Sequence, residues 1–159
     1  MINNSNKSEY LWTIGAILGF ALLLVVGYKI KVSITPSIVA TAPLDTSCDL
    51  RKGKCTTVFP TGEKISLSMT PNSIPVLRPL VLNVTIEGID ASNIEVDFIG
   101  IDMDMGYNRS KLNKINAGNF KGKVVIPACS HSRMEWEAQV LLHTSSGLIM
   151  APFRFYTLK

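Results

Sequence analysis

The chain has 159 residues and a mass of 17.4 kDa, enough for one domain of ordinary size and a short additional segment. Hydrophobic residues make up 47%, charged residues make up 18%, and the mean hydropathy is +0.25, a composition that excludes an intrinsically disordered chain. Three cysteines are too few for a disulfide-scaffold miniprotein, and two histidines are too few for a histidine-rich metal cage. The common nucleotide-binding, zinc-protease and serine-hydrolase motifs are absent from the sequence.

The first predicted element is a transmembrane helix over residues 11–28, preceded by a short N-terminal tail over residues 1–10. The segment carries no charge and would rise about 27 Å as a helix, close to the thickness of a bilayer core. Trp12 and Tyr28 stand near its ends, where their rings favour the membrane interface. The alternatives are a buried core helix and a signal peptide cleaved near residues 40–42. We expect a retained anchor, because the apolar run is longer than that of a usual signal peptide.

The signals for the orientation of this helix conflict. Lys29 and Lys31 directly follow it, and positive-inside counting would therefore keep the C-terminal side in the cytosol. Cys48 and Cys55 indicate a disulfide-closed loop, which requires an oxidising compartment. Because large domains translocate largely regardless of charge, we expect the C-terminal domain on the periplasmic side of a bacterial cytoplasmic (inner) membrane.

A proline-containing tether is predicted over residues 29–46 and a β-sandwich domain over residues 47–159. In the domain, hydrophobic residues alternate with polar ones in short runs separated by turn residues, which is typical of half-buried strands. Strands are expected at 56–59, 65–69, 80–87, 94–98, 120–126, 136–143 and 153–155. This number and spacing predict an all-β, immunoglobulin-like antiparallel β-sandwich.

The cysteines suggest one disulfide and one free thiol. Cys48 and Cys55 enclose six residues that contain Gly53, a natural turn residue, and we expect them to be bonded. A metal site there would need closer cysteine spacing or further ligands nearby. Cys129 is then left over beside His131, in a segment that reads as an exposed loop. It is either a small buried hydrophobic residue or a reactive or ligating thiol.

The segment 100–109 (GIDMDMGYNR) is the most unusual part of the sequence. In an extended chain, residues two apart share one face, so the two methionine thioethers would point together. Thioether, thiolate and imidazole are soft donors that suit Cu(I). The predicted metal ligands are Met103, Met105, Cys129, His131 and Met134. The competing interpretation is that these methionines simply fill gaps in the core.

The same segment allows two other interpretations. Asp102 and Asp104 could bind a hard cation, although two carboxylates are too few for calcium by themselves. Arg109 could instead pair with one of these carboxylates in a purely structural role. Catalysis has little support, because Cys129 and His131 are too close in sequence to face each other readily, and we predict no catalytic residues and no enzyme.

Four further segments, in this order after one apolar anchor, carry a resemblance to a known group. They are 79–84 (PLVLNV), 100–106 (GIDMDMG), 118–122 (GNFKG) and 134–140 (MEWEAQV). The chain resembles small FixH- and YtkA-like proteins and uncharacterised bacterial membrane-anchored β-sandwich proteins with an MGYNR segment. FixH-like proteins are associated with copper-dependent assembly of haem–copper oxidases, so the resemblance implies copper handling. The chain departs from the family in its Cys48–Cys55 loop and in Cys129.

Together these features predict a membrane-anchored, non-enzymatic accessory protein that handles Cu(I) or assists assembly of a copper-containing respiratory complex. The first alternative is a metal-free, membrane-anchored protein-interaction or structural module. A third interpretation is a thiol-active redox protein that uses Cys129. The expected partners are the membrane and a membrane respiratory complex or another membrane protein. No nucleic-acid partner is expected, because the chain from Asp45 onward carries 13 Lys and Arg against 11 Asp and Glu, a net charge of about +2.

Overall fold

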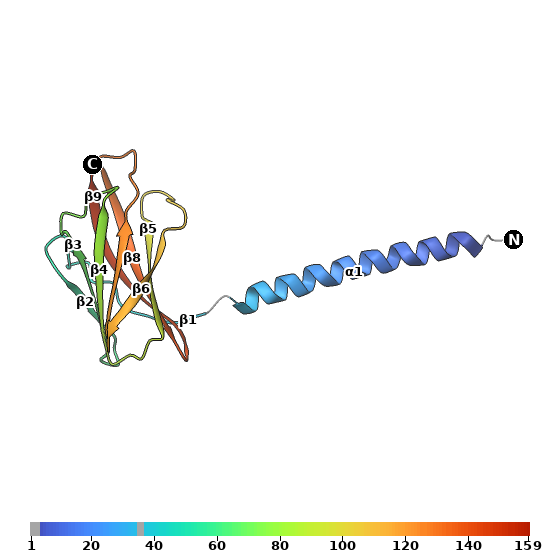
Figure 1. Ribbon diagram of the computed structural model, residues 1–159, viewed down its shortest axis with the longest axis horizontal. Helices are drawn as coiled ribbons and strands as arrows, with labels where there is room; N and C mark the ends of the chain where they lie inside the picture. The colour runs from blue at the N-terminus through green and yellow to red at the C-terminus, as the bar shows by residue number, and fades with distance from the viewer. Residues whose placement is uncertain (1–3, 35–36) are drawn as a thin grey trace. The chain divides into compact units, whose positions relative to one another are not determined.

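The architecture comes from a computed structural model, which describes residues 4–34 and 37–159 (Figure 1). The chain divides into two units, a helix and a β domain that begins at Ser37. Residues 1–3 belong to the predicted tail and residues 35–36 to the predicted tether, and both lie outside the described residues.

The helix, α1, runs from Asn4 to Ile34 and is longer than the predicted segment 11–28. Its stretch Glu9–Lys29 has a mean hydropathy of 2.2 and is long and apolar enough to cross a membrane. A signal sequence near the N-terminus would have the same properties. The helix is therefore a candidate membrane span by length and composition.

Residues 37–159 form nine strands, which make one curled sheet (Figure 1). In chain order they are β1 (Ile38–Thr41), β2 (Cys55–Val58), β3 (Lys64–Thr70), β4 (Pro79–Glu87), β5 (Asn93–Gly100), β6 (Arg109–Asn116), β7 (Asn119–Val125), β8 (Arg133–Thr144) and β9 (Gly147–Leu158). Their order across the sheet is β1-β9-β8-β5-β6-β7-β4-β3-β2. The pairing of β1 with β9 is parallel, and the other pairings among these strands are antiparallel.

The predicted all-β class is confirmed, and strands lie at all seven predicted places. The predicted purely antiparallel arrangement is corrected, because β1 pairs in parallel with β9 and makes the sheet mixed. Strands β1 and β6 were not among the strands predicted from the sequence. β1 lies inside the predicted tether and is held mainly by its backbone pairing, with little side-chain burial. In β6, only Leu112 is buried, so the strand shows no clear alternation.

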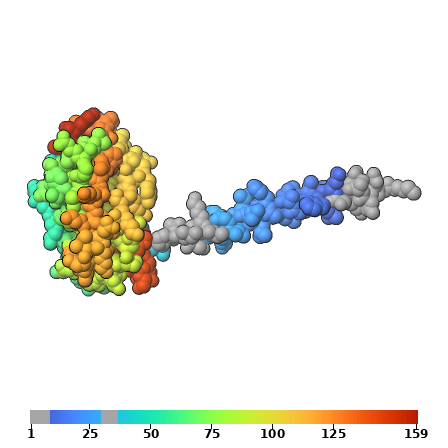
Figure 2. All heavy atoms as spheres, viewed as in Figure 1, coloured from blue at the N-terminus to red at the C-terminus, as the bar shows by residue number. Residues whose placement is uncertain are grey.

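The core is built from the hydrophobic side chains that alternate along the strands. In the space-filling view, segments that are distant in the sequence lie side by side on one face of the domain, as their green, orange and yellow colours show (Figure 2). Trp136 on β8 is completely buried and stacks on Phe155, with ring centroids 6.5 Å apart. Phe98 meets Phe155 edge to face at 6.1 Å. The indole Nε1 of Trp136 donates a hydrogen bond of 3.0 Å to Thr157 Oγ1. This cluster fixes the part of β8 that pairs with Gly100, where the candidate site begins.

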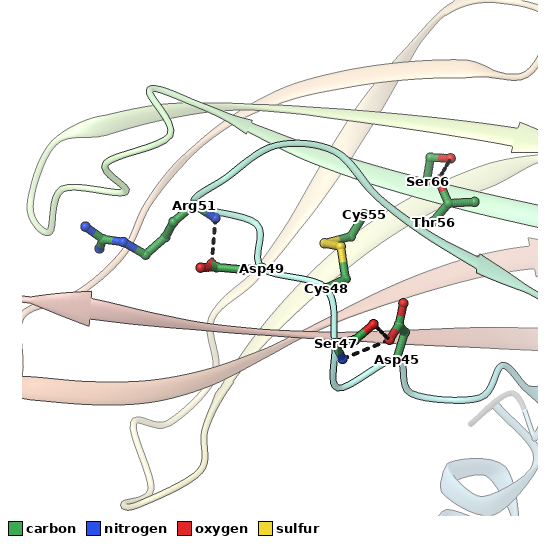
Figure 3. The surroundings of a disulfide bond; sticks show 8 residues. All are labelled: Asp45, Ser47, Cys48, Asp49, Arg51, Cys55, Thr56 and Ser66. Carbon is green, nitrogen blue, oxygen red and sulfur yellow. Dashed lines mark hydrogen bonds between the residues drawn. A yellow bond between two sulfur atoms is a disulfide. The ribbon is translucent and has the colours of Figure 1, made fainter.

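A disulfide links Cys48 to Cys55, with 5.7 Å between their Cα atoms, and confirms the predicted pairing (Figure 3). Cys55 is the first residue of β2, which is an edge strand of the sheet. The disulfide therefore fastens the segment before β2 to the edge of the sheet.

The segment before this disulfide contains a turn that is stabilised by a carboxylate (Figure 3). Asp45 Oδ1 accepts hydrogen bonds from the hydroxyl of Ser47 at 2.6 Å and from the backbone N–H of Ser47 at 2.9 Å. Hydrogen bonds to a carboxylate favour its charged form. The Ser47 hydroxyl and then its backbone N–H accordingly hold the pKa of Asp45 below its ordinary value.

Candidate soft-metal site

Two loops meet where β5 ends and β8 begins. Residues 101–108 join β5 to β6, and residues 126–132 join β7 to β8. Gly100 ends β5 and pairs with Trp136 on β8, so the two loops lie beside neighbouring strands. The five predicted metal ligands are carried by these two loops and by the second residue of β8.

The thiol of Cys129 contacts two of the other predicted ligands. Its Sγ lies 2.9 Å from Met103 Sδ, to which the thiol donates, and 3.6 Å from Nδ1 of His131. Cys129 and Met103 are half-buried and pack against the core, whereas His131 is exposed. The expectation that Cys129 and His131 are too close in sequence to face each other is therefore wrong. The structure brings a thiol, a thioether and an imidazole into one cluster, which we call the soft-donor cluster.

Met105 and Met134 lie next to this cluster, around Gly100. A Cβ atom placed on Gly100 would be 2.5 Å from Met134 Cε and 3.0 Å from Met105 Cγ. Met134 is a core residue with only 1% of its surface exposed, and Met105 is half-buried. Met134 also lines the small void beside Cys129 and His131, whereas Met105 packs against Gly100 and the core.

The prediction that Met103 and Met105 share one face of a strand is wrong, because both residues lie in a loop. Strand β5 ends at Gly100, and the chain then turns. The side-chain amide of Asn108 donates to the carbonyl oxygen of Met105 at 2.8 Å and helps to hold the turn. The loop folds back on Gly100, so that the carbonyl oxygen of Met103 and Cγ of Met105 both lie near the place where a Cβ of Gly100 would stand.

Asp102 and Asp104 each accept a backbone hydrogen bond. Asp102 Oδ2 accepts one from Glu135 N at 3.2 Å, and Asp104 Oδ1 accepts one from Gly106 N at 2.8 Å. The two carboxylates therefore stabilise different parts of the loop. This arrangement gives no support to a joint hard-cation site, which would need several converging oxygen ligands.

The predicted pairing of Arg109 with Asp102 or Asp104 is also wrong. The guanidinium lies 2.9 Å from Asp97 Oδ2 and 3.6 Å from Glu95 Oε2. The cause is the antiparallel pairing of β5 with β6, which places Arg109 directly opposite Asp97. Oppositely charged residues at such positions stabilise a sheet.

The space beside the soft-donor cluster is small. A void of about 10 Å³ is lined by Cys129, His131 and Met134 together with residues near the C-terminus. This volume is close to the smallest that holds one water molecule. The void lies beside Cys129 and His131 and is not lined by Met103, and its size suits a single small ligand such as an ion.

The donor set decides which metal suits the cluster. In the described ranges, 4–34 and 37–159, no group of three or more His, Cys, Asp or Glu side chains could hold a metal ion. A four-ligand zinc site of the usual type is therefore not present among those residues. The soft-donor cluster holds only two such side chains, Cys129 and His131, and its third donor is the thioether of Met103, a ligand type that suits soft ions such as Cu(I).

Comparisons of the chain with protein-family models, with curated proteins and with solved structures find no match. The resemblance to FixH- and YtkA-like proteins therefore remains a prediction from the sequence motifs.

Proposed function

We propose that this protein is a membrane-anchored, non-enzymatic accessory protein that binds Cu(I) at the soft-donor cluster. The observation that supports the proposal most strongly is the contact of Cys129 Sγ with Met103 Sδ at 2.9 Å and with His131 Nδ1 at 3.6 Å. Soft sulfur ligands select Cu(I), and imidazole is also a common copper ligand. A thiolate, a thioether and an imidazole together supply three donors from two loops.

The sulfur atoms must move apart when an ion binds between them. A metal–thiolate bond is about 2.3 Å long, so two sulfur ligands in a trigonal arrangement lie about 4 Å apart. The Met103 and Cys129 sulfurs, now 2.9 Å apart, would separate by about 1 Å. This adjustment is small for Met103, because a methionine side chain has three rotatable bonds.

The proposed location is the periplasmic side of a bacterial cytoplasmic membrane, with α1 as a single anchor. The apolar stretch Glu9–Lys29 and the Cys48–Cys55 disulfide support this location, because the first suits a membrane and the second an oxidising compartment. A reporter fused after Lys159 that works only in the periplasm should be active. An active cytosolic reporter at the same position would contradict this topology.

The finer description of the domain as an immunoglobulin-like sandwich is also a proposal. Its support is that β2, β3, β4 and β7 pair successively on one side of the curled sheet, and β5, β8 and β9 on the other. Strand β6 passes between the two groups, since it pairs with β5 and then with β7.

The proposed biological role is copper delivery to, or assembly of, a copper-containing respiratory complex in the same membrane. A metal-free interaction module is the second candidate, and one observation favours it. Met103, Met105 and Cys129 all pack against the hydrophobic core, as gap-filling side chains do. The two candidates differ in whether the protein binds Cu(I).

A competition titration of the full chain in detergent with a Cu(I) chelator separates the two candidates. Cys129→Ser should weaken binding more than Met103→Leu, because the thiolate carries a charge and the thioether does not. Met69→Leu is the matched control, since Met69 is a buried methionine on β3, outside the cluster. An absence of bound copper, or one affinity for all variants, would refute the copper proposal and favour the interaction module.

A further inference from the structure

The loop of residues 101–108, which carries Met103 and Met105, is attached to the start of β8. Both backbone groups of Glu135, its N–H and its carbonyl, take part in this attachment. The backbone N–H of Ile101 donates to Glu135 O at 3.0 Å. The backbone N–H of Glu135 in turn donates to the Asp102 carboxylate at 3.2 Å. Asp102 is thus the side chain that binds this loop to β8 immediately before Met103.

Gly100 determines how closely the same loop can fold back. A Cβ atom on Gly100 would lie 2.4 Å from the carbonyl oxygen of Met103 and 2.5 Å from Met134 Cε. Real Cβ atoms essentially never come within 3.0 Å of such neighbours. Because the first of these neighbours is backbone, a side chain at position 100 would force the loop away from β8.

We propose that Gly100 and Asp102 are the positioning residues of the copper site, an inference that rests on the proposed function above. Gly100 permits the backbone of Met103 to come close to the end of β5. Asp102 then holds the loop against the start of β8. Neither residue supplies a donor to the ion. Together they keep Met103 Sδ within reach of Cys129 Sγ, which comes from a different loop.

Asp104 provides a matched control for Asp102. Both are exposed aspartates of the same loop, and each accepts one backbone hydrogen bond. The bond to Asp104 comes from Gly106 within the loop, whereas the bond to Asp102 comes from Glu135 on β8. Loss of the Asp104 carboxylate should therefore affect only the turn at Gly106. Loss of the Asp102 carboxylate should change the distance between the loop of residues 101–108 and the loop of residues 126–132.

Cu(I) affinity of full-length variants, measured with a competing chelator, tests this inference. Partners hydrogen-bonded to metal ligands typically contribute 10- to 100-fold to affinity. Because Asp102 bonds to Glu135 N and only positions the loop that carries Met103, Asp102→Ala should weaken binding by about 10-fold, the lower end of that range. Asp102→Asn keeps an acceptor oxygen and should restore most of the affinity, and Asp104→Ala should have a smaller effect. X-ray absorption should show one sulfur ligand fewer on copper in Asp102→Ala, a change that a general loss of stability would not produce.

Gly100→Ala should weaken binding as well, with all donors retained. Gly53→Ala is its control, because a Cβ atom at Gly53 would meet nothing within 4 Å. If Gly100→Ala fails to fold, the comparison of Asp102→Ala with Asp102→Asn decides the question.

Wild-type protein without bound copper would refute both the proposed function and this inference. Wild-type binding that depends on Cys129, with Asp102→Ala binding equally well, would refute the inference alone.

Discussion

Loss of the Cys48–Cys55 disulfide should lower the stability of the β domain by about 2.5 kcal/mol. The bond closes a loop of about eight residues, and the loop-closure entropy removed from the unfolded chain gives this value. The folded contacts change little, because Cys55 is already a buried residue at the start of β2. Most of the effect therefore arises in the unfolded state.

The measurement is urea unfolding of the full chain in detergent, with and without a reductant, followed by tryptophan fluorescence of buried Trp136. For a domain of this size the denaturant slope is about 1–3 kcal/mol per molar urea, so the midpoint should fall by about 0.8–2.5 M. The variant with both Cys48→Ala and Cys55→Ala should match the reduced protein and should not respond to reductant. An unchanged midpoint on reduction would refute the entropic reasoning, and a response of the double variant would trace the effect to another group.

Three further outcomes are expected. Thr157→Val should lower the free energy of unfolding by about 1–3 kcal/mol, because the buried Trp136 Nε1 loses its acceptor; equal urea midpoints would contradict this role. Met105→Leu should lower the free energy of unfolding by less than about 1.5 kcal/mol in the copper-free protein, since the volumes are similar, and a larger loss in the same assay would contradict that estimate. The lowered pKa of Asp45 implies stability that is present above its ordinary pKa and lost as pH falls through the folded value. Asp45→Asn should therefore show a smaller fall in melting temperature below about pH 4, and identical acid profiles would contradict this role of Asp45.

The seven strands with clear hydrophobic alternation could be predicted from the sequence because alternation is what a half-buried strand requires. Strands without that pattern were missed. β6 buries only Leu112, and β1 is held to β9 chiefly by backbone hydrogen bonds, which do not depend on residue type. The parallel direction of β1 likewise depends on where the chain enters the domain, which no local pattern encodes.

The candidate site was predictable in part. The residue types of Met103, Cys129 and His131 indicated soft-donor chemistry, and the structure brings these three together. The close approach of the loop backbone to Gly100 was missed, although a glycine just after a predicted strand could have suggested it. The role of the backbone of Glu135 has no sequence signal, since every residue other than proline carries an N–H and a carbonyl group.

The most direct test of the central claim is X-ray absorption spectroscopy of the full-length protein loaded with one equivalent of Cu(I). We expect two sulfur ligands and one nitrogen ligand on copper, contributed by Met103, Cys129 and His131. The Cys129→Ser variant, measured in the same way, should lose one sulfur ligand. Copper bound only through nitrogen or oxygen ligands, or a spectrum unchanged by Cys129→Ser, would show that the soft-donor cluster is not a copper site.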